Sequence, residues 1–167
     1  MSVKTQENLM AAFAGESQAN RKYLAFAQKA EKEGKDKIAR LFRAVAEAET
    51  IHALKHLETA AKVGTTGENV KAAVEGETYE YTKMYPGFIE QAEEEGQTAA
   101  ARSFRLANSA EKEHAHLYQK ALEALEAGGD LAAESFHLCP VCGYVALNQP
   151  PDNCPICNAA GKSFKPY

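Results

Sequence analysis

The 167-residue chain lacks several features that would place it in other classes of protein. It has no apolar run long enough to cross a membrane, and residues 1–10 are polar rather than a hydrophobic leader. It also lacks an excess of positive charge, because its formal net charge is −4. An acidic chain is a poor partner for nucleic acid or for an anionic membrane. We therefore expect a cytoplasmic protein that binds neither nucleic acid nor a membrane.

Proline is nearly absent from residues 5–127, where Pro86 stands alone, and cysteine is absent before Cys139. Ala, Glu, Lys, Leu and Gln dominate this part of the chain, and all five favour helices. Glycines mark the points at which helices should end. The predicted helices span residues 5–33, 36–63, 66–95 and 97–127. The predicted fold class is an all-α four-helix bundle followed by a small C-terminal domain.

The two halves of the helical region repeat each other at an offset of 62 residues. Matches this dense at one offset indicate a duplicated helical hairpin. The register slips by one residue before Tyr85, since Glu16 aligns with Glu77 only after a shift of one. The aligned pairs include Arg40 with Arg102, Phe42 with Phe104, Glu49 with Glu111, His52 with His114 and Tyr23 with Tyr85.

Carboxylates and imidazoles interrupt the apolar stripes of these helices. Glu49 with His52, and Glu111 with His114, form two Glu-x-x-His motifs, and residues three apart share one helix face. Five carboxylates in the seam of a bundle would repel one another unless cations neutralise them. Glu and His suit Fe or Mn, so the pattern predicts a dimetal site. The candidate ligands are Glu16, Glu49, His52, Glu77, Glu80, Glu111 and His114.

Less specific interpretations of these residues exist. A buried polar network or ordinary surface charge would explain one Glu-x-x-His motif, but not two at equivalent places on the apolar stripe. Tyr23 and Tyr85 lie about two turns along the same face from Glu16 and Glu77. Each is either an aromatic core residue or a phenol that hydrogen-bonds to a ligand carboxylate.

The composition changes after residue 130. Gly128, Gly129 and Asp130 end the last helix, and residues 131–137 form a linker. From residue 138, proline and cysteine become frequent, and the remaining piece is too short to build a core of its own. The predicted domains are a helical domain over residues 1–130 and a four-cysteine domain over residues 138–167.

All four cysteines lie in two Cys-x-x-Cys pairs, Cys139 with Cys142 and Cys154 with Cys157. Four thiolates from two tight loops predict a tetrahedral metal site. The residue after each pair, Gly or Asn, favours positive φ, which turns backbone N–H groups toward the sulfurs. The spacing alone leaves open an Fe that carries single electrons and a Zn that folds the tail, and the neighbouring dimetal site favours Fe. Two disulfides are the less favoured alternative in the cytosol.

Taken together, these motifs resemble the rubrerythrin family over essentially the whole chain. The matching segments are residues 13–20, 48–52, 75–86 and 110–114 and the rubredoxin-like sequences Cys-Pro-Val-Cys-Gly-Tyr and Cys-Pro-Ile-Cys. The resemblance implies an oxo- and carboxylate-bridged diiron site in a ferritin-like bundle, followed by a rubredoxin-like domain with one iron. It also implies that Glu49 and Glu111 bridge the irons, that Glu16 binds one, and that Glu77 and His114 bind the other.

The resemblance further implies an activity. Hydrogen peroxide would be reduced to water, as protection against oxidative stress, with electrons from NADH delivered by rubredoxin or an NADH-dependent reductase. One iron would exchange His52 for Glu80 on oxidation, and Tyr23 and Tyr85 match family positions near the metals. The alternatives are a ferritin-type protein that oxidises and stores iron, a zinc-ribbon interaction module, and an oxygenase acting on an organic substrate.

The short connection between the second and third predicted helices predicts a homodimer. A ferritin-like bundle needs its second and third helices parallel, so their connection must run the length of the bundle. A helix of this kind is about 40 Å long, whereas residues 64–67 reach at most about 14 Å. We therefore expect two chains to exchange helical hairpins. Each site would take Glu16, Glu49 and His52 from one chain and Glu77, Glu80, Glu111 and His114 from the other.

Overall fold

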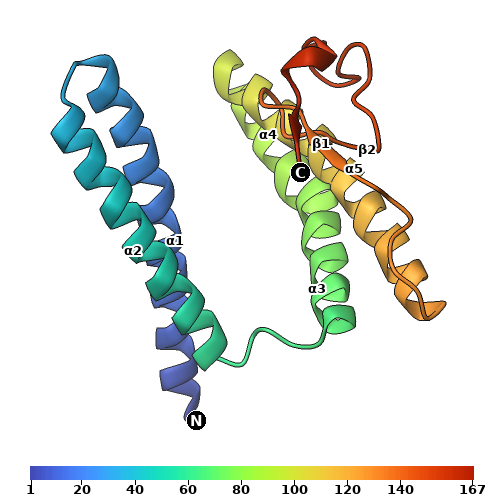
Figure 1. The fold of residues 1–167 in the computed structure, drawn as a ribbon, viewed down its shortest axis with the longest axis horizontal. Coiled ribbons are helices and arrows are strands. Elements are labelled where there is room, and N and C mark those ends of the chain that lie inside the picture. The colour runs from blue at the N-terminus through green and yellow to red at the C-terminus, as the bar shows by residue number, and fades with distance from the viewer. The chain divides into compact units, whose positions relative to one another are not determined.

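The computed structural model describes residues 1–167, which form two compact units, residues 1–64 and residues 65–167 (Figure 1). The N-terminal unit is a hairpin of α1 (Val3–Lys32) and α2 (Asp36–Thr59). The C-terminal unit contains α3 (Thr66–Tyr79), α4 (Tyr85–Glu94), α5 (Thr98–Glu126) and a small sheet. None of these helices combines the length and the apolar character that a membrane span needs. The four predicted helical segments are confirmed, but the third is interrupted and the second ends at Thr59 rather than at residue 63.

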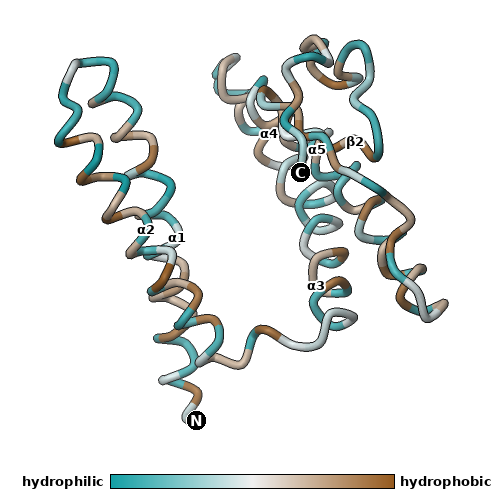
Figure 2. Tube along the Cα trace, viewed as in Figure 1, coloured by the Kyte–Doolittle hydropathy of each residue, from teal (hydrophilic) through white to brown (hydrophobic).

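Alanines form the contact between α1 and α2. Ala39, Ala46 and Ala53 recur at every seventh residue of α2 and are buried, as are Ala27 and Ala30 on α1. Side chains this small allow two helices to pack closely, and their spacing keeps them on one stripe. Figure 2 shows hydrophobic and hydrophilic residues alternating along both helices, as expected for elements that each bury one face.

The duplication predicted from the sequence is present in three dimensions. Tyr23, Phe26 and Phe42 form an aromatic trio in the N-terminal unit, with ring centroids 5.6–6.2 Å apart. The same trio recurs 62 residues later as Tyr85, Phe88 and Phe104. The ion pair between Arg43 and Glu31 recurs between Arg105 and Glu93, and Gly34 and Gly96 both end a helix with positive φ. Each hairpin is therefore folded by the same local contacts.

The third predicted helix is not continuous. A π-helical turn, Glu80–Met84, separates α3 from α4. This turn accounts for the one-residue slip in the repeat, because a π turn accommodates one more residue than an α turn. Glu16 and Tyr23 are seven residues apart, Glu77 and Tyr85 are eight apart, and the wider turn keeps the second pair on one face.

The four-cysteine domain contains a three-stranded antiparallel sheet. Its strands are β1 (Phe136–Leu138), β2 (Val145–Leu147) and β3 (Lys165–Pro166), in the order β2-β1-β3, with a 3₁₀ turn at Gly161–Ser163. Its buried residues are Cys139, Ala146, Cys154, Gly161 and Phe164. A Cβ at Gly161 would lie 1.9 Å from the carbonyl oxygen of Pro151, so no larger residue fits there. Two cysteines in so small a core indicate that a bound metal supplies much of its stability.

Candidate metal centres

The first ligand cluster lies within the α1–α2 hairpin. Glu16 on α1 meets Glu49 and His52 on α2, and one ligand atom from each lies within 4.8 Å of the others. Nδ1 of His52 is 3.1 Å from a carboxylate oxygen of Glu49. The side chain of Glu49 is 14% exposed and that of His52 is 57% exposed, so the imidazole stands at the open edge of the cluster.

Asn20 joins the two helices one turn away from this cluster. Its amide nitrogen donates to the carbonyl oxygen of Ala46 at 2.7 Å and to Oγ1 of Thr50 at 2.9 Å. These bonds set the position of α1 against α2 next to Glu16 and Glu49. The sequence did not indicate this role for Asn20.

The second cluster repeats the first within the C-terminal unit. Glu77 on α3 meets Glu111 and His114 on α5, again with ligand atoms within 4.8 Å. Nδ1 of His114 lies 2.7 Å from Glu111 and 3.8 Å from Glu77. All three side chains are between 18% and 23% exposed, so this cluster is more enclosed than its N-terminal counterpart.

One contact distinguishes His114 from His52. Nε2 of His114 donates to the carbonyl oxygen of Gly143, in the four-cysteine domain, at 2.9 Å. A carbonyl only accepts, so Nε2 carries a proton, and Nδ1, which faces Glu111, is the ring nitrogen that would bind a metal. Within its own hairpin, Nε2 of His52 has no such contact, and the ring is bonded only through Nδ1 to Glu49. No sequence signal pointed to the Gly143 carbonyl, because it is a backbone atom.

Burial and charge repulsion within the second cluster raise the pKa values of its carboxylates. Burial, the hydrogen bond to Glu111 and the charge of Glu111 raise the pKa of Glu77 to about 7. Burial and then the charge of Glu111 raise the pKa of Glu80. These carboxylates compete for protons when no cation is present, and a divalent metal removes the competition. The donor set therefore fits a carboxylate-bound metal pair.

Glu80 and the two tyrosines stand apart from the converging ligands. Glu80 is close enough to interact electrostatically with Glu77, but it is not one of the three residues that meet. Burial, and then the charges of the three glutamates, raise the pKa of Tyr85, so its phenol lies near the cluster. Tyr23 packs against Phe26 and Phe42.

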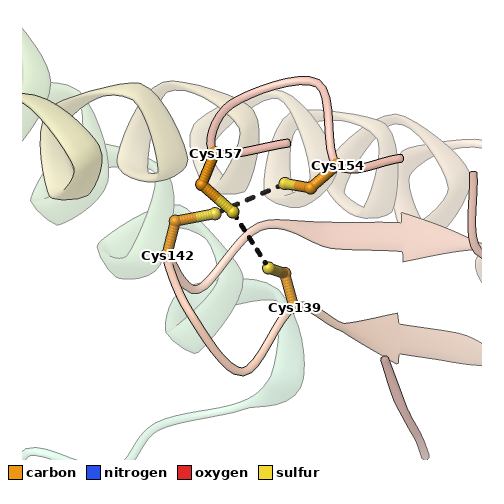
Figure 3. A group of neighbouring side chains, drawn as sticks. All are labelled: Cys139, Cys142, Cys154 and Cys157. Carbon is orange, nitrogen blue, oxygen red and sulfur yellow. Dashed lines mark hydrogen bonds between the residues drawn. The ribbon is translucent and has the colours of Figure 1, made fainter. Parts of the chain in front are cut away.

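The four cysteines converge from two loops (Figure 3). Sγ of Cys139 lies 3.5 Å from that of Cys157, and Sγ of Cys142 lies 3.5 Å from that of Cys154. A disulfide requires about 2.05 Å, whereas thiolates about 2.3 Å from a tetrahedral metal are separated by about 3.8 Å. The arrangement fits a metal site and excludes the disulfide alternative for these pairs.

Backbone geometry supports thiolates at this site. Gly143 and Asn158 have φ of 86° and 62°, as predicted. The N–H groups of Tyr144 and Ala159 donate to the sulfurs of Cys142 and Cys157. Burial alone would raise the pKa of Cys139, but hydrogen bonds from the backbone of Cys142 and Val141 outweigh it and lower this pKa to about 7. A thiol of this kind is readily deprotonated for metal binding.

Comparisons with known proteins agree with this geometry. The rubrerythrin family model matches residues 7–122, and the rubrerythrin rubredoxin-like domain model matches residues 137–165. Nigerythrin of Nitratidesulfovibrio vulgaris is 39% identical, over 98% of this chain and 86% of its own. Rubrerythrin of Porphyromonas gingivalis is also 39% identical, over 98% and 90%. Rubrerythrin-2 of Clostridium acetobutylicum is 34% identical over the full length of both.

A solved structure extends the similarity to the fold. The fully reduced, all-ferrous state of nigerythrin covers 100% of this chain and 89% of its own, with 38% identity and a TM-score of 0.59. The predicted fold class, ferritin-like helices with a C-terminal rubredoxin-like domain, is confirmed. So are the predicted metal sites, a diiron site and a rubredoxin-like four-cysteine site. The chain therefore belongs to the rubrerythrin family.

Proposed function

We propose that this protein is a peroxidase that reduces hydrogen peroxide to water and protects against oxidative stress. Two electrons and two protons convert one peroxide into two waters. When bound, the two irons each supply one electron to the O–O bond. The observation that carries this proposal is the contact between the second ligand cluster and the four-cysteine domain, because it links a two-electron site to a one-electron site.

Electrons enter through the four-cysteine site in this scheme. Gly143 follows Cys142 in the chain, and its carbonyl accepts the hydrogen bond from His114. The backbone of two adjacent residues and one hydrogen bond therefore connect a thiolate ligand of the four-cysteine site with His114 of the carboxylate site. The electrons originate from NADH and arrive through rubredoxin or an NADH-dependent reductase.

In this proposal His52 and Glu80 would be alternative ligands of one iron, His52 in the reduced state and Glu80 in the oxidised state. Four carboxylates balance two ferrous ions, and a fifth is favourable only when the irons become ferric. His52 is the more exposed imidazole and has no bond that holds Nε2, which supports its role as the group that leaves. Glu80 is adjacent to Glu77 and lies in the π turn, which supports its role as the group that arrives.

We further propose the assignment of the remaining residues. Glu49 and Glu111 bridge the metals, and Tyr23 and Tyr85 support the ligand carboxylates. The helical domain spans residues 1–130, the linker 131–137 and the rubredoxin-like domain 138–167, which accords with the two family matches.

The substitution Cys142→Ser tests the proposed function. It removes a thiolate ligand from the electron-entry site and leaves the carboxylate ligands unchanged. We expect anaerobically reduced protein to consume one peroxide per diiron site as fast as the wild type, while steady turnover with NADH and redox partners falls about tenfold or more. Stopped-flow absorbance measures the first rate, and NADH consumption measures the second.

The control is Lys162→Ser, an exposed residue of the same domain, which should keep both rates. Steady turnover by Cys142→Ser at the wild-type rate would contradict the electron route. A wild-type protein that consumes no peroxide and forms a large shell on gel filtration would instead support the ferritin-type alternative.

A further inference from the structure

An apolar cavity of about 310 Å³ adjoins the second ligand cluster. Glu77 and His114 line one end of it. The other end is built by Leu117, Tyr118 and Ala121 of α5. Leu131, Phe136 and Val145 close it from the linker and the sheet. All of these residues lie in the C-terminal unit.

Regular spacing on two elements forms the walls. His114, Leu117, Tyr118 and Ala121 follow steps of three and four along α5, so they form one stripe that begins at a metal-ligand candidate. Leu138 pairs with Val145 across the sheet, and Phe136 lies two residues from Leu138, so Phe136 and Val145 share a face. The cavity is therefore the space between an apolar helix stripe and an apolar sheet face.

The cavity has the size and character of a small-molecule site. An apolar cavity of about 150 Å³ is enough to bind benzene. Here about 310 Å³ is lined mostly by aliphatic and aromatic side chains, and apart from the phenol of Tyr118 the polar side chains are Glu77 and His114. Tyr118 is 40% exposed, which places an aromatic ring at the edge between the cavity and solvent. An uncharged aryl or alkyl group of up to about ten carbons fits these dimensions.

We infer that this cavity binds the apolar tail of an organic hydroperoxide and directs its O–O group to the metal ligands Glu77 and His114. The inference rests on the proposed peroxidase function and extends it to a second substrate class. Hydrogen peroxide has no tail and cannot use the cavity. An aryl hydroperoxide buries its ring against the apolar walls and leaves its only polar group beside Glu77 and His114.

The reaction balances as for hydrogen peroxide. The O–O bond breaks, and the two electrons that reach the carboxylate-bound site reduce both oxygens. Two protons from water complete one alcohol and one water. The alcohol keeps the apolar tail, so it remains a ligand of the cavity after the reaction, and its binding can be measured with no redox step.

The test uses cumene hydroperoxide as substrate and its product, 2-phenyl-2-propanol, as probe. Saturation-transfer NMR on the oxidised, metal-loaded protein measures alcohol binding, and peroxidase assays measure kcat/KM for cumene hydroperoxide and hydrogen peroxide. Ala121→Leu fills the cavity without touching Glu77 or His114. We expect it to weaken alcohol binding. We also expect kcat/KM for cumene hydroperoxide, divided by kcat/KM for hydrogen peroxide, to fall by about tenfold.

Ala99→Leu makes the same substitution at an exposed position near the start of α5 and should leave binding and ratio unchanged. Leu131→Ala changes the opposite wall by removing atoms, so it should also weaken binding even if Ala121→Leu does not fold. Intact hydrogen peroxide reduction with no alcohol binding by the wild type would contradict the cavity assignment alone. Failure to reduce either peroxide would contradict the proposed function, and the NMR result would still decide the binding site.

Discussion

At the scale of single residues, the raised pKa of Glu77 shows that its cluster depends on a bound cation. Burial and Glu111 raise its pKa to about 7, well above the ordinary value of 4.5. The folded, metal-free protein therefore holds this proton more tightly than the unfolded chain does. The contribution of Glu77 to the free energy of unfolding is fully present below about pH 4.5 and is lost as the pH rises through about 7. A bound metal replaces the proton and removes the loss.

This linkage predicts the behaviour of Glu77→Gln. The amide resembles the protonated acid and does not titrate. We expect the metal-free variant to gain stability relative to metal-free wild type as the pH is raised from about 5 to about 8. Urea unfolding followed by circular dichroism measures the difference. Glu75→Gln, at an exposed position of the same helix, is the control, and its difference from wild type should stay constant. A constant difference for Glu77→Gln as well would show that Glu77 is not held in a repulsive cluster.

At the scale of elements, the π turn makes the second hairpin differ from the first. α1 runs from Glu16 to Tyr23 without interruption, whereas Glu80–Met84 widens the helix between Glu77 and Tyr85. Single π turns inside α-helices are frequent at functional sites. Here the turn adds a carboxylate, Glu80, for which the N-terminal unit has only Ala19. The second hairpin therefore has one more candidate carboxylate than the first.

Removal of one residue from this turn tests its role. Deletion of Thr82 shortens the step from Glu77 to Tyr85 to that of α1, so the helix should remain folded and still bind iron. Glu80 should lose its position, and peroxide turnover should fall about ten- to a hundredfold. Iron analysis and steady-state assays measure both effects. The control is Thr82→Ala, which keeps the chain length and should retain turnover. Wild-type turnover by the deletion variant would show that catalysis does not need the π turn.

At the scale of the whole molecule, each unit carries only half of the ligands. Glu16, Glu49 and His52 lie in one hairpin, and Glu77, Glu111 and His114 in the other. α2 has 24 residues, which corresponds to about 36 Å. Residues 60–65, which connect α2 to α3, span about 25 Å at most. A ferritin-like crossover within one chain would need a longer connection, which supports our proposal of a homodimer with exchanged hairpins.

A complementation experiment tests the exchange. One chain carries Glu49→Gln with His52→Ala, and a second, differently tagged chain carries Glu111→Gln with His114→Ala. In an exchanged dimer of the two, one site joins both damaged halves and the other joins both intact halves. Tandem-purified heterodimers should then contain about half of the wild-type diiron content and activity.

Without exchange, every site has one damaged half, so the heterodimers should contain no intact diiron site. Each variant alone should be inactive under either arrangement, which makes the homodimers the matched controls. Light scattering gives an independent check, because a monomeric, fully iron-loaded wild-type species would also exclude the exchange.

Much of the fold and of the metal sites was predictable from the sequence. Helix positions, the duplication, the two Glu-x-x-His motifs and the cysteine pairs depend on spacing within a few residues, and local backbone geometry determines those. Glu77 and Tyr85 are one residue further apart in the sequence than Glu16 and Tyr23, and this difference even revealed the extra residue of the π turn. It did not reveal the turn itself, because an inserted residue can also be accommodated by a kink or by a loop.

The sequence by itself determined which side chains could bind metal, since periodicity places Glu and His on buried helix faces and Cys-x-x-Cys folds locally around an ion. Only the tertiary structure decided which of them are linked. His114 bonds to Gly143 across 29 residues, and the apolar cavity arises where α5 meets the sheet. Both depend on how the small domain packs against a helix, and no spacing along the chain encodes a contact between surfaces that fold separately.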